Sequence, residues 1–129
     1  MDLNSSFCIG NAISGGKGGW FIGQFFPEQE GLQHQSAVEI KWGQHPKGER
    51  RRCFAKTNAA TTISVLISGA FVMKLMIDGR LHEIELSRPG DYAAVGPDVP
   101  HSWEATEDCL VISIRFPSIE ASQTELPFS

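Results

Sequence analysis

The chain has 129 residues, of which 41% are hydrophobic and 20% are charged, and its formal net charge is -4. This composition is typical of one soluble domain with a single core, and it leaves no room for a second domain of similar size. The acidic balance gives no electrostatic case for binding nucleic acid, and no stretch reaches the roughly 20 apolar residues of a membrane span.

The N-terminal region is expected to be irregular. Its start, MDLNSSFCIG, has an acidic residue where a secretory signal would be basic, so we expect a cytoplasmic protein. Residues 10–19, GNAISGGKGG, predict a flexible lead-in within a segment 1–36 that can contribute an edge strand. The cysteines at 8, 53 and 109 show no close spacing, which argues against a disulfide framework or a thiolate zinc site.

From about residue 37 the hydrophobic pattern has a period of two, which is typical of β-strands. The alternation is clearest in 38–42, 62–68 and 110–115, and turn residues lie between these runs. Short strands separated by turns predict an all-β sandwich or barrel. We expect this barrel over 37–116, with a C-terminal tail over 117–129.

The dipeptide Asp78-Gly79 predicts a two-residue hairpin loop, which sets the register of the two strands around it. Ile77 then lies opposite Arg80. The pairs further out are Leu75 with His82, Lys74 with Glu83, Met73 with Ile84 and Phe71 with Leu86. The apolar face of this hairpin is expected to point inward and to carry His82 near its turn end.

The run TTISVLISGAFVMKLMIDGRLHEIELSRPGDYAAVGPDVPHSW, residues 61–103, resembles a cupin domain, and the resemblance extends over about 37–116. Gly90, Pro97 and His101 stand where the second cupin motif has its glycine, a turn proline and its metal-binding histidine. Asp98 stands where a glycine is usual. The resemblance implies an all-β, single-domain fold of the cupin type, a double-stranded β-helix or jelly-roll barrel.

The first cupin motif is not matched. Family members carry two histidines separated by one residue, then a glutamate, then a glycine. If Gly69 is that glycine, Thr62 takes the place of the glutamate. The histidine places then fall on Lys56 and Asn58, or on Ala55 and Thr57. None of these is an expected ligand of a transition metal, so the resemblance implies the fold more strongly than the chemistry.

Two hypotheses of function remain open. The favoured one is a small-molecule-binding cupin with a degenerate metal site and no cofactor. A strand over 49–55 would turn at least one arginine toward the cavity, and the fork of Arg51 suits an anionic ligand such as a carboxylate or phosphate. His101, Trp103 and Tyr92 complete the predicted ligand-binding set.

The alternative is a metal-dependent cupin enzyme, of the oxygenase or isomerase type, with relocated ligands. His101 would then share a divalent metal (Fe, Mn, Ni or Zn) with His45, Glu49 or His82, since a catalytic metal keeps about three protein ligands. A metal-free sugar epimerase, which the resemblance also implies, would need an acid and a base. His101 could be that base, and Tyr92 is the only tyrosine. Whether the protein is an enzyme stays open.

The resemblance also implies the two faces of the strand at 61–68. Thr62, Ser64 and Leu66 would point inward, leaving Ile63, Val65 and Ile67 outside. Such a β-branched stripe either packs under the aromatic N-terminal segment at 21–26 or forms a subunit interface. Because sheet-packed dimers are what the resemblance implies, we expect a homodimer that binds a small molecule, with no nucleic-acid or membrane partner.

Overall fold

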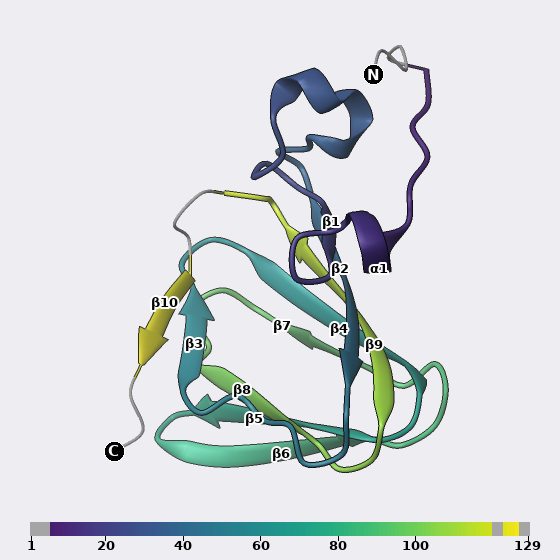
Figure 1. Ribbon diagram of the computed structural model, residues 1–129. Coiled ribbons are helices and arrows are strands. Elements are labelled where there is room, and N and C mark those ends of the chain that lie inside the picture. Colours follow the sequence, from purple (N-terminus) through teal and green to yellow (C-terminus); the bar gives the residue numbers. More distant parts are fainter. Residues whose placement is uncertain (1–5, 120–122, 127–129) are drawn as a thin grey trace.

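The structure is a computed structural model that describes residues 6–119 and 123–126. Within these residues, ten strands form two antiparallel five-stranded sheets that face each other (Figure 1). The first sheet has the order β1-β2-β9-β4-β7, and the second has the order β10-β3-β8-β5-β6. The all-β barrel predicted from the period-two pattern is therefore confirmed.

The elements have the following bounds. The first sheet consists of β1 (Trp20–Ile22), β2 (Glu39–His45), β9 (Cys109–Phe116), β4 (Thr61–Ser68) and β7 (Tyr92–Val95). The second consists of β10 (Gln123–Leu126), β3 (Phe54–Thr57), β8 (His101–Ala105), β5 (Phe71–Ile77) and β6 (Arg80–Leu86). Two short helical elements precede β2, namely α1 (Ala12–Gly15) and the 3-10 helix η1 (Glu28–Gln33).

The hydrophobic core lies between the two sheets, at one end of the barrel. Leu66 of β4 and Val111 of β9 lie opposite each other in the first sheet and are almost fully buried. They belong to one buried cluster with Phe71 of β5 and Leu86 of β6 from the second sheet. Further along the same inner face, Thr62 and Ser64 of β4 replace apolar residues, so this face changes from apolar to polar along the strand.

The β5–β6 hairpin has the register predicted from Asp78-Gly79, including Ile77 opposite Arg80 and Leu75 opposite His82. Both turn residues have positive φ, 52° for Asp78 and 75° for Gly79, as the tight primed hairpin turns require. His82 shares the face of Leu75 but is exposed, because burial on β6 begins only toward Leu86. The expectation that His82 points into the interior is therefore wrong.

The glycine-rich lead-in contains structure that the sequence analysis did not predict. Asn11 caps α1 by accepting hydrogen bonds from the backbone N–H groups of Ile13 and Ser14, at 2.9 and 3.1 Å. After α1 the chain turns into β1, which pairs with β2 at the edge of the first sheet. Residues 1–5 of the predicted N-terminal segment lie outside the described residues.

The C-terminal segment predicted as a tail includes β10, which pairs with β3 from Gln123 opposite Thr57 to Leu126 opposite Phe54. Residues 120–122 and 127–129 of that segment lie outside the described residues. In the part of the chain that the structure describes, no helix is long and apolar enough to cross a membrane.

The outer face of the first sheet is apolar. Ile63 of β4 lies opposite Ile114 of β9, and Val65 lies opposite Ile112. Ile67, further along β4, is 44% exposed. The inward placement of Thr62, Ser64 and Leu66 is confirmed, since all of these are buried. The homodimer expected from the outward stripe stays a prediction.

Candidate functional site

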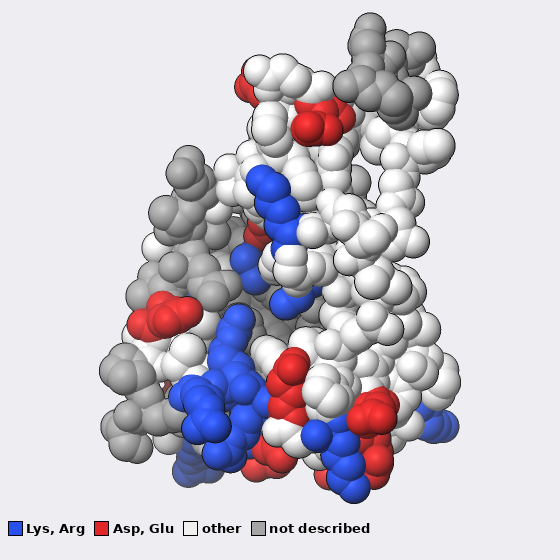
Figure 2. All heavy atoms as spheres, viewed as in Figure 1, with Lys and Arg blue, Asp and Glu red and all other residues white. Residues whose placement is uncertain are grey.

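A small cavity of about 60 Å³ lies between the two sheets, directly beside the hydrophobic core, since Phe71 and Met73 belong to both. Its lining is mostly polar and aromatic. The lining residues are Trp20, Lys41, His45, Arg51, Thr62, Ser64, Phe71, Met73, His101, Trp103, Ser113 and Arg115. Figure 2 shows Lys and Arg side chains gathered in and around a hollow on this face of the molecule, between β2 and β3.

A second, larger hollow of about 280 Å³ lies next to the cavity, and Lys41 and His45 line both. Its walls come from β2 and from the glycine-rich turn before β1, where Gly19 packs tightly against the backbone of Trp42. The Nε1 atom of Trp42 is buried and has no hydrogen-bond partner among residues 6–119 and 123–126. Lys41 and His45 therefore stand where the two spaces meet.

The polar half of the cavity is built by β2, β9 and β4 in register. Glu39 of β2 lies opposite Arg115 of β9, and Arg115 lies opposite Thr62 of β4. Two residues further along β2, Lys41 lies opposite Ser113 of β9. Residues directly opposite in a sheet share a face, so these two rows of polar side chains point into the barrel together.

Arg51 reaches the cavity from the loop before β3. The strand predicted over 49–55 is wrong in its bounds, because β3 begins only at Phe54. The backbone N–H of Arg51 donates to the carbonyl of Trp103 at 3.1 Å, while Ala55 lies opposite His101. The bridge between Arg50 and Glu104 places Arg51 opposite Trp103, so Arg51 shares the inner face of Trp103 and lines the cavity.

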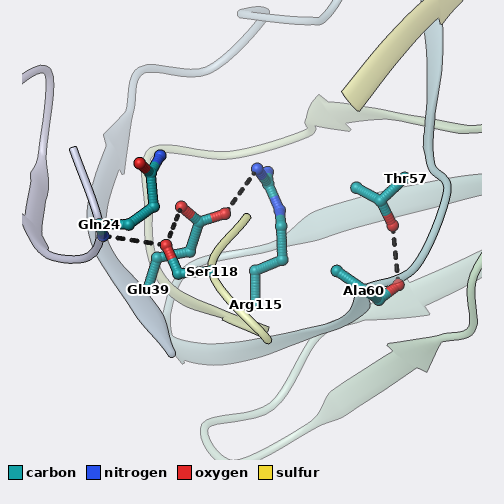
Figure 3. Close-up of polar contacts among 6 residues, drawn as sticks. All are labelled: Gln24, Glu39, Thr57, Ala60, Arg115 and Ser118. Atoms are coloured by element: carbon teal, nitrogen blue, oxygen red, sulfur yellow. Dashed lines mark hydrogen bonds and ion pairs between the residues drawn. The ribbon is translucent and has the colours of Figure 1, made fainter. Parts of the chain in front are cut away.

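Glu39 and Arg115 form a buried ion pair inside the barrel (Figure 3). Arg115 Nη1 donates to Glu39 Oε1 at 2.9 Å, and the hydroxyl of Ser118 donates to the other carboxylate oxygen at 3.1 Å. The Ser118 hydroxyl also accepts from the backbone N–H of Gln24, at 3.0 Å. Both carboxylate oxygens of Glu39 thereby accept a hydrogen bond, but among the described residues Arg115 Nε and Thr62 Oγ1 are buried without partners.

Lys41 lies among cations. Its Nζ stands 5.7 Å from the centre of the Trp20 ring, and the guanidinium carbon of Arg115 stands 5.0 Å from the same ring. Burial lowers the pKa of Lys41, and the nearby charges of Arg51 and Arg115 lower it further, while Glu49 acts in the opposite direction. Burial likewise lowers the pKa of Arg51.

His101 is a buried histidine whose ring is fixed by a backbone hydrogen bond. It is 7% exposed, and its Nδ1–H donates to the carbonyl of Val99 at 3.0 Å, which leaves Nε2 available to the cavity. Burial lowers the pKa of His101, and the charges of Arg51 and Arg115 act in the same direction, against the hydrogen bond to Val99. The ring therefore resists taking up a proton in the folded protein.

This lowered pKa predicts that the fold becomes less stable as the pH falls through about 6.5, the ordinary value for histidine. Below that pH the histidine binds a proton more readily in the unfolded chain than in the folded protein, so protonation favours unfolding. Urea denaturation of the wild type and of His101→Gln between about pH 7 and 5.5 measures the effect. The variant is expected to lose less stability over this range.

His82→Gln is the matched control, because His82 is exposed. It is expected to keep the pH dependence of the wild type. Identical pH dependence in the wild type and His101→Gln would contradict the assignment.

The residues present do not fit a metal centre of the cupin kind. Ala55 and Thr57 face inward on β3, and the Thr57 hydroxyl donates to the carbonyl of Ala60 at 2.7 Å (Figure 3). Thr62 occupies the place that the family gives to its glutamate. Within residues 6–119 and 123–126, no three His, Cys, Asp or Glu side chains come together in a way that could hold a metal ion.

The structure brings the predicted metal ligands together only in part, since His45 and His101 both line the cavity. His45 lines the cavity, but its Nδ1 contacts the carboxylate of Glu49, and its ring stands 4.5 Å from that of Trp103. Glu49 lines the larger hollow rather than the cavity. His82 is exposed on β6, so the structure separates it from His101.

The structure places His101, Trp103 and Arg51 of the predicted ligand-binding set in the cavity lining. Tyr92 is placed elsewhere, which corrects the prediction. Alternation on β7 turns Ala93 and Val95 into the core, so Tyr92 points outward and is 68% exposed. It is thus no partner for His101 in an acid and base pair.

Trp20, Lys41 and Arg115 line the cavity but were not identified from the sequence. Lys41 and Arg115 alternate with the apolar residues of their strands and would ordinarily be assigned to the outside. The available signal was the strand at 61–68, whose small polar residues face inward. Because β4 pairs with β9 and β9 pairs with β2, polar residues face inward on all of these strands at this end of the barrel.

The sequence matches no family model, and no curated protein matches it either. Solved structures do match. Oxalate decarboxylase from Bacillus subtilis is 18% identical, with a TM-score of 0.62 over 77% of this chain and 26% of its own. A cupin superfamily protein from Desulfitobacterium hafniense DCB-2 is 18% identical, with a TM-score of 0.56 over 66% of this chain and 72% of its own.

A third match is a conserved protein with a double-stranded β-helix domain from Klebsiella pneumoniae, 14% identical, with a TM-score of 0.59 over 73% and 78% of the two chains. At these identities the matches show the fold. The chain has the cupin-type double-stranded β-helix fold, as the resemblance implied. It spans about a quarter of the decarboxylase chain.

Proposed function

We propose that this cupin-fold chain is a small-molecule-binding protein whose ligand is a small organic carboxylate, held in the barrel cavity by Arg51, Arg115 and Lys41. The observation that supports this proposal most directly is the charge of the cavity. Three cationic side chains line it, and Glu39, the carboxylate paired with Arg115, already accepts a hydrogen bond at each of its two oxygens.

The cationic groups of the cavity require an anionic partner. Among the described residues, neither Lys41 nor Arg51 has an ion-pair partner, and Arg115 Nε and Thr62 Oγ1 are buried without acceptors. Buried polar groups without hydrogen-bond partners are costly, and a charge taken out of water needs a counter-charge. A carboxylate supplies two acceptor oxygens and a negative charge, and its plane matches the guanidinium fork.

The size and walls of the cavity favour a small ligand with a planar acid group. About 60 Å³ holds a few heavy atoms. Trp20 and Trp103 provide flat aromatic walls, and His101 Nε2 provides one further hydrogen-bonding atom. The remainder of a longer ligand would extend past Lys41 into the larger hollow. The metal-dependent alternative would need ligands that the described residues do not bring together.

The proposal predicts that Arg51→Gln weakens binding of small carboxylates such as acetate, pyruvate or succinate. A hydrogen bond to a charged group contributes roughly 1.5–3 kcal/mol, so the loss of affinity is expected to be about tenfold to a hundredfold. Isothermal titration calorimetry, or chemical-shift titration by NMR for weak ligands, measures it. The matched control is Arg52→Gln, because Arg52 is next in sequence but exposed and outside the cavity lining.

Three outcomes would contradict this function. One is equal affinity for the carboxylate and for the corresponding uncharged amide. Another is inorganic phosphate that displaces the carboxylate and binds more tightly, which would change the ligand class. The third is near-stoichiometric metal in protein purified without chelator, lost in His101→Ala, which would support the metal-dependent enzyme instead.

A further inference from the structure

We propose that Lys41 is a nucleophilic amine that forms a Schiff base with the carbonyl carbon of a 2-oxo acid bound in the cavity. The inference rests on the proposed carboxylate binding and adds the chemical class of the ligand. It also assigns to Lys41 a role beyond that of a counter-charge.

The position of Lys41 is the first support. Its place in β2 opposite Ser113 turns it into the barrel, and it lines both the inner cavity and the larger hollow beside it. A ligand whose acid group occupies the inner cavity and whose remainder lies in the larger hollow would therefore contact this side chain. The Nζ atom lies over the face of Trp20, so the amine is held against a rigid wall.

Lys41 differs from the other lysines of the chain in its partners. Lys47, Lys56 and Lys74 pair with the carboxylates of Glu107, Asp98 and Glu104 respectively, and Lys17 Nζ donates to the carbonyl of Phe25 at 3.2 Å. Among the described residues, Lys41 has no such oxygen partner. A carboxylate partner would favour the ammonium form, which is not nucleophilic.

The charges around Lys41 favour the neutral amine. The guanidinium groups of Arg51 and Arg115 lower the pKa of Lys41 beyond the effect of burial. Glu49 opposes this, but its carboxylate is engaged with His45. Proteins activate a lysine amine as a nucleophile by removing it from water or by placing it beside other cations.

A 2-oxo acid fits this arrangement because its carbonyl is bonded directly to its carboxylate. With the carboxylate on Arg51 and Arg115, the carbonyl carbon is presented toward the Lys41 side of the cavity. The neutral Nζ attacks that carbon, and the carbonyl electron pair moves to oxygen, which takes up a proton. Loss of this oxygen as water then leaves a C=N bond. Overall, amine and ketone give imine and water, with no change of oxidation state.

The experiment is reductive trapping with pyruvate. Full-length protein is incubated with pyruvate and then with borohydride, which reduces an imine to a stable secondary amine. Intact mass and peptide mapping locate the product. We expect the reduced adduct on Lys41. In Lys41→Arg, which keeps the positive charge, the amount of adduct is expected to fall to the level found without pyruvate. Lys47→Arg is the matched control, since Lys47 is exposed, and it is expected to retain the adduct.

Binding of lactate, which has the carboxylate but no ketone, separates this inference from the proposed function. If lactate and pyruvate bind but adduct is spread over all lysines or persists in Lys41→Arg, the Schiff base is refuted and carboxylate binding stands. If neither acid binds and no adduct forms, both fail. Specific adduct on Lys41, with lactate binding retained in Lys41→Arg, supports both.

Discussion

Gly69→Ala is expected to lower the free energy of unfolding by roughly 2–5 kcal/mol, through backbone strain and overpacking together. Gly69 has a φ of +86° in the turn between β4 and β5, a conformation that side chains rarely adopt. A Cβ atom there would stand 2.0 Å from the carbonyl oxygen of Asp108 and 2.7 Å from the Cα of Cys109. These are backbone atoms at the start of β9, so relief requires moving a strand. Urea denaturation followed by tryptophan fluorescence measures the loss.

Gly79→Ala is the matched control for this prediction. Gly79 also has a positive φ, +75°, but no atom lies within 4 Å of an added Cβ. The control therefore carries backbone strain without a clash, and it is expected to lose about 1–2 kcal/mol. Equal losses in the two variants would show that the close approach of Gly69 to β9 contributes nothing.

Glu39→Gln is expected to lower the free energy of unfolding by about 3–5 kcal/mol at neutral pH, because it removes one partner of a buried ion pair. The side chains of Glu39 and Arg115 are only 6% and 14% exposed. The amide keeps the shape of the carboxylate but not its charge. Arg115 would then stand without a counter-charge in a cavity that already holds Lys41 and Arg51. Chemical denaturation of the wild type and the variant measures the difference.

Glu104→Gln provides the comparison for Glu39→Gln. Glu104 pairs with Lys74 at 3.3 Å, but both side chains are about a third exposed. An ion pair that water screens contributes about 0–1 kcal/mol, so this variant is expected to stay close to the wild type. If Glu39→Gln is as stable as Glu104→Gln, the ion pair inside the barrel does not hold the cavity wall together.

Local sequence patterns predicted the parts of this protein that depend on neighbouring residues. Asp78-Gly79 set the register of the β5–β6 hairpin, because two residues of positive φ allow only a tight turn. The period-two pattern predicted an all-β barrel. Thr62 and Ser64 were correctly placed inside from the cupin resemblance.

Which residues line the cavity was harder to predict, because the answer depends on which face of each strand points inward. Alternation divides the residues of a strand between two faces but does not say which face is inside. Ile40 of β2 and Ile114 of β9 point outward, whereas Lys41, Glu39 and Arg115 point inward, because these strands pair in register with β4. The prediction of Tyr92 failed for the same reason, since β7 turns Ala93 and Val95 inward.

The sequence alone thus determined the fold class, one hairpin register and the presence of His101 and Trp103 on a strand of the barrel. Only the tertiary structure decided which charges meet in the cavity. The pairing of Arg50 with Glu104 of β8 places Arg51 on the inner face beside Trp103, and the pairing of distant strands brings Lys41, Arg115 and Trp20 together. Pairing between distant strands depends on the packing of the whole barrel, whereas a turn or an alternating strand is dictated by adjacent residues.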